Sequence, residues 1–202
     1  MKLVTLLEDF NRSERREITM PHINLPDGEP GIIGPLTAYR ETEKPLDDLA
    51  NVLMCGPSSL TRAEREVIAT YVSNGNECYF CTNSHAATAR HLLGSDCSLM
   101  DEILQDVMTA NVEEKLRALL IIAGKVRQNG RLVTDEDVQR ARTAGADDKA
   151  IHDTVLIAAM FCMFNRYVDG LATWAPRDPE VYEAIGARIA TKGYGSRFRE
   201  NP

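Results

Sequence analysis

Aromatic and basic residues are scarce in this 202-residue sequence, which has one tryptophan and 23 lysines and arginines against 30 acidic residues. The formal charge of -7 argues against a nucleic-acid or acidic-membrane surface, which would need a basic face, so we expect neither partner. No apolar run approaches the roughly 20 residues that cross a bilayer, and the opening segment reaches Asp9 too early for a secretory signal. We therefore expect a cytoplasmic protein.

Cysteine is also infrequent, with five residues in the chain. Cys55, Cys97 and Cys162 each stand alone among apolar or mixed neighbours, which suits reduced thiols better than a disulfide scaffold. Only Cys78 and Cys81 look paired, so they are the one candidate for thiol chemistry.

The length and the 44% hydrophobic content suit a single domain over residues 1–202. Between residues 20 and 47, closely spaced prolines and glycines predict an irregular arm that wraps the core or a neighbouring subunit. The segment 130–133 has a weak strand pattern, and residues 192–202 look like a mobile or partner-bound tail. Helical patterns dominate elsewhere, so the predicted fold class is all-α.

A helical hairpin is predicted over residues 61–93. Thr61 and Glu64 have the spacing of a capping box, and apolar residues follow at helical spacing. The sequence Asn-Gly-Asn at 74–76 ends this helix, and a second helix is predicted from about residue 77 to Leu93, with Gly94 as its stop. A short helix over residues 46–54 precedes the hairpin.

A second helical group is predicted over residues 113–174. It contains helices at 113–128, at 134–144 with a Thr134 cap, and at 149–174 with an Asp147 cap. The long apolar helix at 149–174 should lie in the middle of the core. Another short helix is predicted at 99–109, and no sequence repeat is strong enough to relate this group to the hairpin.

Cys78 and Cys81 lie three residues apart in the first turn of a predicted helix. This spacing places their side chains about 5 to 6 Å apart, within the range that a disulfide closes without strain. A helix N-terminus stabilises a thiolate through its free N–H groups and its dipole. The pair is therefore predicted to cycle between dithiol and disulfide.

His85 lies one helical turn after Cys81, so its imidazole can take the thiol proton or return it to a leaving group. Glu66 lies about 12 Å before the turn and His85 about 12 Å after it, so an antiparallel hairpin brings them level. A carboxylate bonded to the far ring nitrogen would fix the tautomer. In this hypothesis Cys81 attacks a peroxide, Cys78 resolves the product, His85 carries the proton and Glu66 orients the imidazole.

Other uses of a CxxC pair are open at this point, including a zinc site and a structural disulfide. Zinc would need a further Cys or His cluster, which neither Glu66 nor His91 provides. Covalent haem is excluded because no histidine follows Cys81 directly. The alternative functions are a redox sensor or thiol–disulfide switch without turnover and, less favoured, a metal-binding structural module.

The four residues follow the pattern Glu, eleven residues, Cys-x-x-Cys, three residues, His. In this pattern the chain resembles the alkylhydroperoxidase AhpD-like group of the carboxymuconolactone decarboxylase superfamily, and in particular its peroxidase-related branch. The likeness extends upstream through GPSSLTRAEREVIATYVS. More loosely, it runs from the Gly/Pro-rich arm to NRYVDGLATWAP and so covers most of the chain. Phe80 stands where better-understood relatives have a second histidine in the proton relay.

The resemblance implies an all-helical fold that assembles into homo-oligomers, as dimers, trimers or hexamers, and peroxide reduction through the cysteine pair. Lactone decarboxylase relatives lack the cysteine pair, so decarboxylation is not expected. We predict a thiol-dependent peroxidase for hydrogen peroxide or organic hydroperoxides, with no bound cofactor or metal. Its predicted catalytic residues are Cys81, Cys78, His85 and Glu66, and the implied reductant is an external dithiol, lipoyl or thioredoxin-like.

Overall fold

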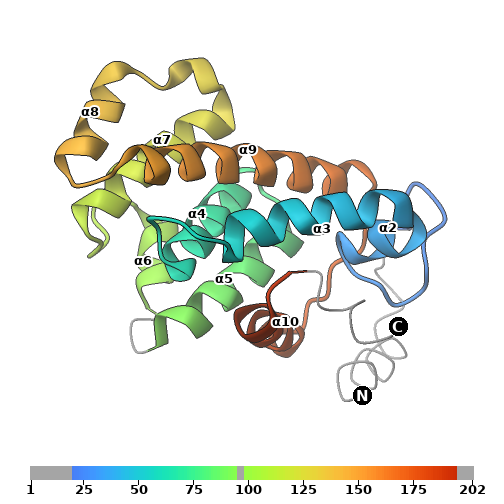
Figure 1. Cartoon of the computed structure of the whole chain (residues 1–202). Coiled ribbons are helices and arrows are strands. Elements are labelled where there is room, and N and C mark those ends of the chain that lie inside the picture. Colours follow the sequence, from blue (N-terminus) through green and yellow to red (C-terminus); the bar gives the residue numbers. More distant parts are fainter. Residues whose placement is uncertain (1–19, 95–97, 195–202) are drawn as a thin grey trace.

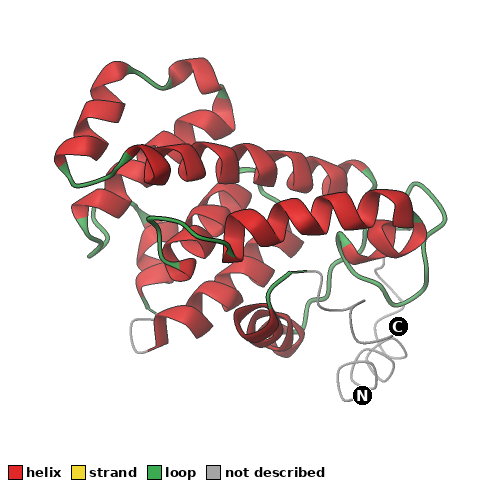
Figure 2. Cartoon of the chain, in the orientation of Figure 1, coloured by secondary structure: helices red, strands yellow, loops and turns green. Residues whose placement is uncertain are grey.

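The computed structural model describes residues 20–94 and 98–194. Over these ranges the chain consists of helices and loops without a strand, which confirms the all-α prediction (Figure 2). None of the helices in the described ranges has both the length and the apolar character to span a bilayer. The α-helices are α2 (Ile33–Ala38), α3 (Arg40–Cys55), α4 (Arg62–Gly75), α5 (Tyr79–Leu93), α6 (Leu99–Gln105), α7 (Glu114–Gln128), α8 (Asp135–Thr143), α9 (Asp148–Gly170) and α10 (Pro179–Lys192).

Helix α4 lies at the centre of the packing and contacts α5, α7 and α9 (Figure 1). Helix α10 packs against the side of α5, and α3 runs beside α9 across one face. The core residues on these helices are almost inaccessible to solvent, as expected where several apolar helix faces meet. They include Val67, Ile68, Ala69 and Val72 on α4, Leu119 and Leu120 on α7, and Ile157 and Phe161 on α9.

The predicted hairpin is formed by α4 and α5. The Thr61 hydroxyl accepts a hydrogen bond from the Glu64 N–H at 3.1 Å, while the Thr61 N–H donates to the Glu64 carboxylate at 2.7 Å, so the predicted capping box is present. At the turn, the Cys78 N–H donates to the Ser73 carbonyl at 3.1 Å, and Glu77 has a positive φ of 61°. Cys78 is consequently the N-cap of α5.

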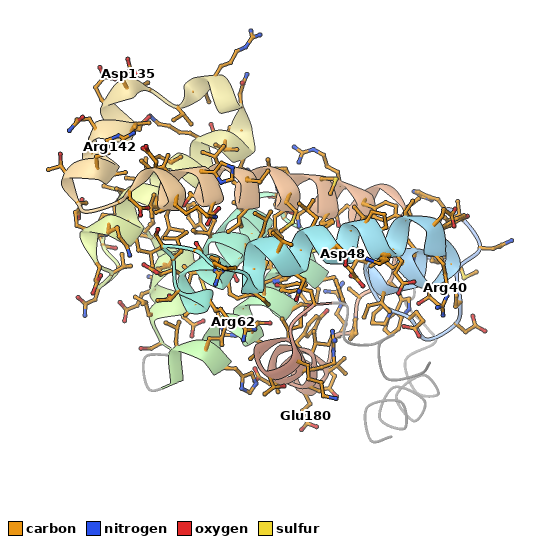
Figure 3. All side chains as sticks on the ribbon, viewed as in Figure 1. Arg40, Asp48, Arg62, Asp135, Arg142 and Glu180 are labelled. Atoms are coloured by element: carbon orange, nitrogen blue, oxygen red, sulfur yellow. The ribbon has the colours of Figure 1, made fainter. Side chains whose placement is uncertain are left out.

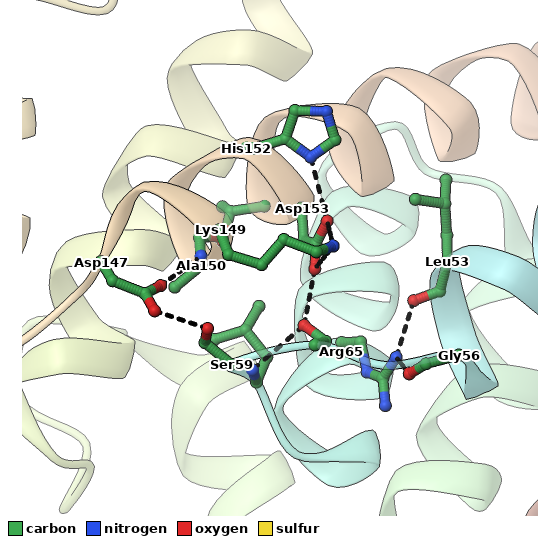
Figure 4. Close-up of polar contacts among 12 residues, drawn as sticks. Leu53, Gly56, Ser59, Arg65, Asp147, Lys149, Ala150, His152 and Asp153 are labelled. Atoms are coloured by element: carbon green, nitrogen blue, oxygen red, sulfur yellow. Dashed lines mark hydrogen bonds and ion pairs between the residues drawn. The ribbon is translucent and has the colours of Figure 1, made fainter.

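A polar cluster ties the loop before α4 to the first turns of α9 (Figure 4). Asp153 is 1% exposed, and its carboxylate accepts hydrogen bonds from Ser58 Oγ and Lys149 Nζ, both at 2.6 Å. The N-cap of α9, Asp147, accepts a further bond from Ser59 Oγ at 2.6 Å. Because a buried carboxylate is costly without partners, these bonds fix where α9 crosses the start of α4.

Two arginines in the first turn of α4 attach this helix to its neighbours. The Arg65 guanidinium is buried and donates to the carbonyls of Leu53 and Gly56 at 2.9 Å, at the C-terminal end of α3. Arg62 reaches the other way and donates to the carbonyls of Ile189 and Ala190, in the last turn of α10 (Figure 3). Both use the free carbonyls that end a helix, so α3, α4 and α10 are joined near one point.

The prediction of an irregular arm over 20–47 is wrong beyond residue 32, because α2 and the first half of α3 lie there. Pro35 is the third residue of α2, where a helix makes no use of the backbone N–H. Pro45 lies inside α3 and removes one helical hydrogen bond. The burial of Ala50, Leu53 and Met54 on the same helix outweighs that loss.

Helix ends also differ from the predicted ones. α9 ends at Gly170 rather than 174, because Ala172 takes a positive φ of 49° and the chain turns away. α6 ends at Gln105 rather than 109, and residues 130–133 form a 3₁₀ turn, Gly130–Leu132, in place of a strand.

α10 was not predicted, although Asp178 caps it and Pro179 occupies its first turn. The tail prediction is wrong for residues 192–194, because Lys192 is the last residue of α10, Gly193 is its C-cap and Tyr194 hydrogen-bonds to Glu66. The remainder of the predicted tail, 195–202, lies outside the described residues.

Candidate active site

Both thiols of the CxxC pair lie at the start of α5 in the reduced form. Cys78 is 0% exposed and Cys81 is 3% exposed. They belong to a small apolar cluster between α5, the end of α9 and α10, separate from the main core. The other buried members of this cluster are Phe80, Ala87, Val168, Val181, Tyr182, Ile185 and Ile189.

The irregular part of the arm covers this cluster. Gly31 has a φ of 55°, and a Cβ at this position would lie 2.1 Å from a Phe80 ring carbon, so only glycine fits there. The Gly31 N–H donates to the carbonyl of Trp174 at 2.9 Å, which joins the arm to the loop after α9. Phe80 is therefore a packing residue held between the arm and Tyr182, with ring centroids 6.1 Å apart.

Glu66 and His85 meet across the hairpin, as the count from the turn predicts. The Glu66 Oε2 atom lies 2.8 Å from His85 Nδ1, and the side chains are 1% and 11% exposed. The Phe161 ring and the imidazole pack in a T-shaped arrangement, with centroids 4.5 Å apart and an interplanar angle of 84°. The carboxylate and the aromatic ring together restrict the orientation of the imidazole one turn along α5 from Cys81.

Tyr194 completes this polar group and was not identified from the sequence. Its hydroxyl lies 2.6 Å from Glu66 Oε1 and 3.2 Å from His85 Nδ1. The Tyr194 ring lies nearly parallel to the imidazole, with ring centroids 6.1 Å apart and an interplanar angle of 13°. Sequence spacing gives no signal for this contact, because Tyr194 is 128 residues from Glu66 and 109 from His85.

Helix α10 brings Tyr194 to the site by packing closely on α5. A Cβ at Gly186 would lie 2.7 Å from the Ala87 carbonyl carbon and 2.8 Å from the Thr88 nitrogen, so the two backbones are nearly in contact. Arg62 holds the last turn of α10, and Gly193, with a φ of 74°, ends it.

The surroundings of Cys78 favour its protonated form. A hydrogen bond to Cys81 and burial raise the pKa of the Cys78 thiol well above its ordinary value. The negative charge of Asp169, at the end of α9, raises the pKa of the Cys78 thiol further. Burial raises the pKa of Asp169, and the Cys78 hydrogen bond opposes that change. Cys78 is thus the thiol that keeps its proton, and Cys81 is the candidate nucleophile.

The other cysteines and histidines that the structure describes make no direct contact with the Cys78–Cys81 pair or the Glu66–His85 pair. Cys55 and Cys162 are free thiols, and Cys97 lies outside the described residues. His91 is near Glu183 on the exposed side of α5. Across residues 20–94 and 98–194, no three His, Cys, Asp or Glu side chains are grouped so as to hold a metal ion.

Comparison with known proteins shows a sequence similarity to one family. The sequence model of the Carboxymuconolactone decarboxylase family matches residues 40–124, which include the whole hairpin and all four predicted site residues. No curated protein matches the chain significantly.

Several solved structures share the fold. An uncharacterized peroxidase-related protein from Silicibacter sp. TM1040 aligns with a TM-score of 0.69 and 26% identity, over 82% of this chain and 96% of that one. An uncharacterized peroxidase-related protein from Ralstonia eutropha JMP134, described as an alkylhydroperoxidase AhpD core, aligns with a TM-score of 0.69 and 24% identity. The alignment covers 78% of this chain and 80% of that one. A protein of unknown function from Agrobacterium tumefaciens aligns with a TM-score of 0.59 and 22% identity, over 73% of this chain and 99% of that one.

The family match covers the hairpin, and the structural neighbours share the all-helical fold that the resemblance to the AhpD-like group implies. The all-helical fold with the cysteine pair at a helix start is the arrangement expected of that group. Over residues 40–124 the chain is thus similar to the Carboxymuconolactone decarboxylase family, and its fold is similar to that of the peroxidase-related structures.

Proposed function

We propose that this protein is a thiol-dependent peroxidase that reduces hydrogen peroxide or organic hydroperoxides through Cys78 and Cys81. The observation that carries the proposal is the buried Glu66–His85 pair, 2.8 Å between Oε2 and Nδ1, held one helical turn beyond Cys81. A carboxylate on one imidazole nitrogen leaves the other nitrogen free to exchange a proton with a nucleophile. Peroxidase-related names among the structural neighbours support the same reaction class.

The proposed cycle has three steps. The Cys81 sulfur attacks the peroxide oxygen, the O–O bond breaks, and an alcohol or water leaves with the thiol proton, carried by His85. The Cys78 thiol then attacks the Cys81 sulfenic acid, forming the disulfide and releasing water. An external dithiol finally reduces the disulfide and is itself oxidised, which restores both thiols.

The division of roles between the thiols follows from their surroundings. Its hydrogen bond with Cys81 and its burial keep Cys78 protonated in the dithiol form, so it is the less reactive thiol towards peroxide and is left as the resolving one. Cys81 lies in the first helical turn, where the helix N-terminus can stabilise its thiolate and His85 can take its proton. Our proposal includes a lipoyl or thioredoxin-like reductant and a homo-oligomeric assembly, both taken from the family resemblance.

Turnover is the direct test of this function. Peroxide consumption is followed with dihydrolipoamide or reduced thioredoxin as the electron donor, and Cys81→Ser serves as the inactive control. The proposal predicts many peroxides consumed per protein and no consumption by the variant. Consumption no faster than that by the donor alone would contradict it.

A redox sensor is the second candidate, and the burial of both sulfurs favours it. Thiols that are 0% and 3% exposed react with a large reductant only after the cover opens. A sensor would form the Cys78–Cys81 disulfide once, in proportion to added peroxide, and dithiol donors would restore it slowly. The turnover assay separates the two candidates, because only the peroxidase consumes peroxide continuously.

A further inference from the structure

Tyr194 is the residue of the site that neither the cysteine motif nor the hairpin accounts for. It follows Gly193, which ends α10 with a φ of 74° and leaves little space for a side chain, since a Cβ there would lie 3.1 Å from Asn51 Oδ1. Arg62 binds the two carbonyls of the preceding turn at 2.9 and 3.0 Å. The position of the Tyr194 ring is therefore set by contacts from α3 and α4 as well as by α10.

The hydroxyl of Tyr194 has two polar neighbours but one proton to donate. Glu66 Oε1 is 2.6 Å away and His85 Nδ1 is 3.2 Å away. The shorter distance and the charge of the carboxylate make Glu66 the acceptor. His85 Nδ1, at 2.8 Å from Glu66 Oε2, is then best occupied by a proton, since an unprotonated nitrogen would face a carboxylate oxygen with no hydrogen between them.

We propose that Tyr194 is a positioning residue, whose hydroxyl holds the Glu66 carboxylate by Oε1 so that Oε2 selects the Nδ1–H tautomer of His85. In this tautomer Nε2 carries the free lone pair, which accepts the proton of the Cys81 thiol. The use of that lone pair in catalysis rests on the proposed peroxidase function. The tautomer itself depends only on the contacts among Tyr194, Glu66 and His85.

The charges around Tyr194 keep its hydroxyl in the donor form. Burial, and next the negative charge of Glu66, raise the pKa of Tyr194 well above its ordinary value. The negative charge of Cys55 on α3 also raises the pKa of Tyr194, and the positive charge of Arg62 on α4 lowers it. The aromatic ring also lies nearly parallel to the imidazole, at 13°, so the hydroxyl and the ring restrict His85 together.

The test separates the hydroxyl from the ring with Tyr194→Phe, which keeps the ring. Nitrogen-15 spectra of histidine-labelled protein near neutral pH report which imidazole nitrogen carries the proton, and His85→Asn identifies the signal. The matched control is Tyr182→Phe, whose hydroxyl donates to the Pro176 carbonyl at 2.8 Å in the neighbouring apolar cluster. We expect the Nδ1–H tautomer in the parent and in the control, and a mixture of tautomers in Tyr194→Phe.

A second measurement uses no peroxide. The rate of Cys81 alkylation by iodoacetamide is compared in a Cys78→Ser background with and without Tyr194→Phe, and we expect it to fall by about 2- to 12-fold. Identical tautomers in the parent and in Tyr194→Phe, or the same change in Tyr182→Phe, would overturn the proposal. If the tautomer shifts but the parent does not reduce peroxide, the positioning role stands and the proposed peroxidase function fails.

Discussion

Replacing Glu66 with glutamine removes the negative charge from the site while keeping the shape of the side chain. The two carboxylate oxygens have different partners, because Oε2 lies 2.8 Å from His85 Nδ1 and Oε1 lies 2.6 Å from the Tyr194 hydroxyl. An amide offers one oxygen and one NH₂ group, so it can accept from only one of these donors. Since residue 66 is 1% exposed, solvent does not replace the lost acceptor.

The size of the effect follows from the kind of hydrogen bond that is lost. A hydrogen bond to a charged group contributes about 1.5–3 kcal/mol, and about 1.36 kcal/mol corresponds to a tenfold change in rate. If the bond supports the imidazole mainly while it takes the thiol proton, Glu66→Gln slows the reaction of Cys81 by about 10- to 150-fold. The unpaired donor should also lower the free energy of unfolding by about 1–3 kcal/mol.

The assay measures the reaction of Cys81 with hydrogen peroxide in a Cys78→Ser background, which isolates the first step. Glu180→Gln makes the same charge change at an exposed position in the first turn of α10, outside the site, and should leave the rate within about twofold (Figure 3). An unchanged rate in Glu66→Gln, in a protein that retains its helical content, would refute the reasoning.

Three further predictions concern packing and stability. Gly186→Ala should lower the free energy of unfolding, measured by urea denaturation, by about 1–3 kcal/mol, because the added Cβ would meet the α5 backbone. The control is Gly170→Ala, whose Cβ meets no atom within 4 Å and which should not destabilise the protein. Gly31→Ala should displace the arm from Phe80 and speed alkylation of the buried thiols; an unchanged rate would argue against the arm as their cover. Burial raises the pKa of Asp153, but hydrogen bonds from Lys149, Ser58 and His152 lower it more, to below its ordinary value. The ionised Asp153 carboxylate thus stabilises the folded state above the unfolded-state pKa of about 4, and this stabilisation is lost as pH falls. Asp153→Asn should therefore lower the melting temperature near neutral pH and change it less in acid. A pH-independent difference would contradict this assignment.

The parts of the fold that were predictable are those with local signals. Thr61 and Glu64 form a capping box within four residues, and the turn at 74–76 separates two helical patterns. A hairpin with known helix ends then places Glu66 opposite His85 by counting alone. Sequence therefore predicted the hairpin and the contact between these two side chains.

The parts that were missed depend on packing between distant segments. The many prolines between residues 20 and 47 lead to the prediction of an irregular arm where α2 and the start of α3 lie. A proline in the first turn is, however, compatible with a helix. α10 does have a local start signal, since Asp178 caps it and Pro179 follows in its first turn. Tyr194 has none, because its place beside His85 depends on how α10 packs on α5 and how Arg62 holds the end of α10.

Intact mass after a brief exposure to peroxide tests the central claim most directly. Hydrogen peroxide and cumene hydroperoxide are each added to the parent, to Cys78→Ser and to Cys81→Ser. The account predicts that the parent loses two hydrogens as the Cys78–Cys81 disulfide forms, that Cys78→Ser gains one oxygen on Cys81, and that Cys81→Ser is not oxidised at this rate. Oxidation of the pair no faster than that of glutathione, or a first oxygen on Cys78, would contradict it.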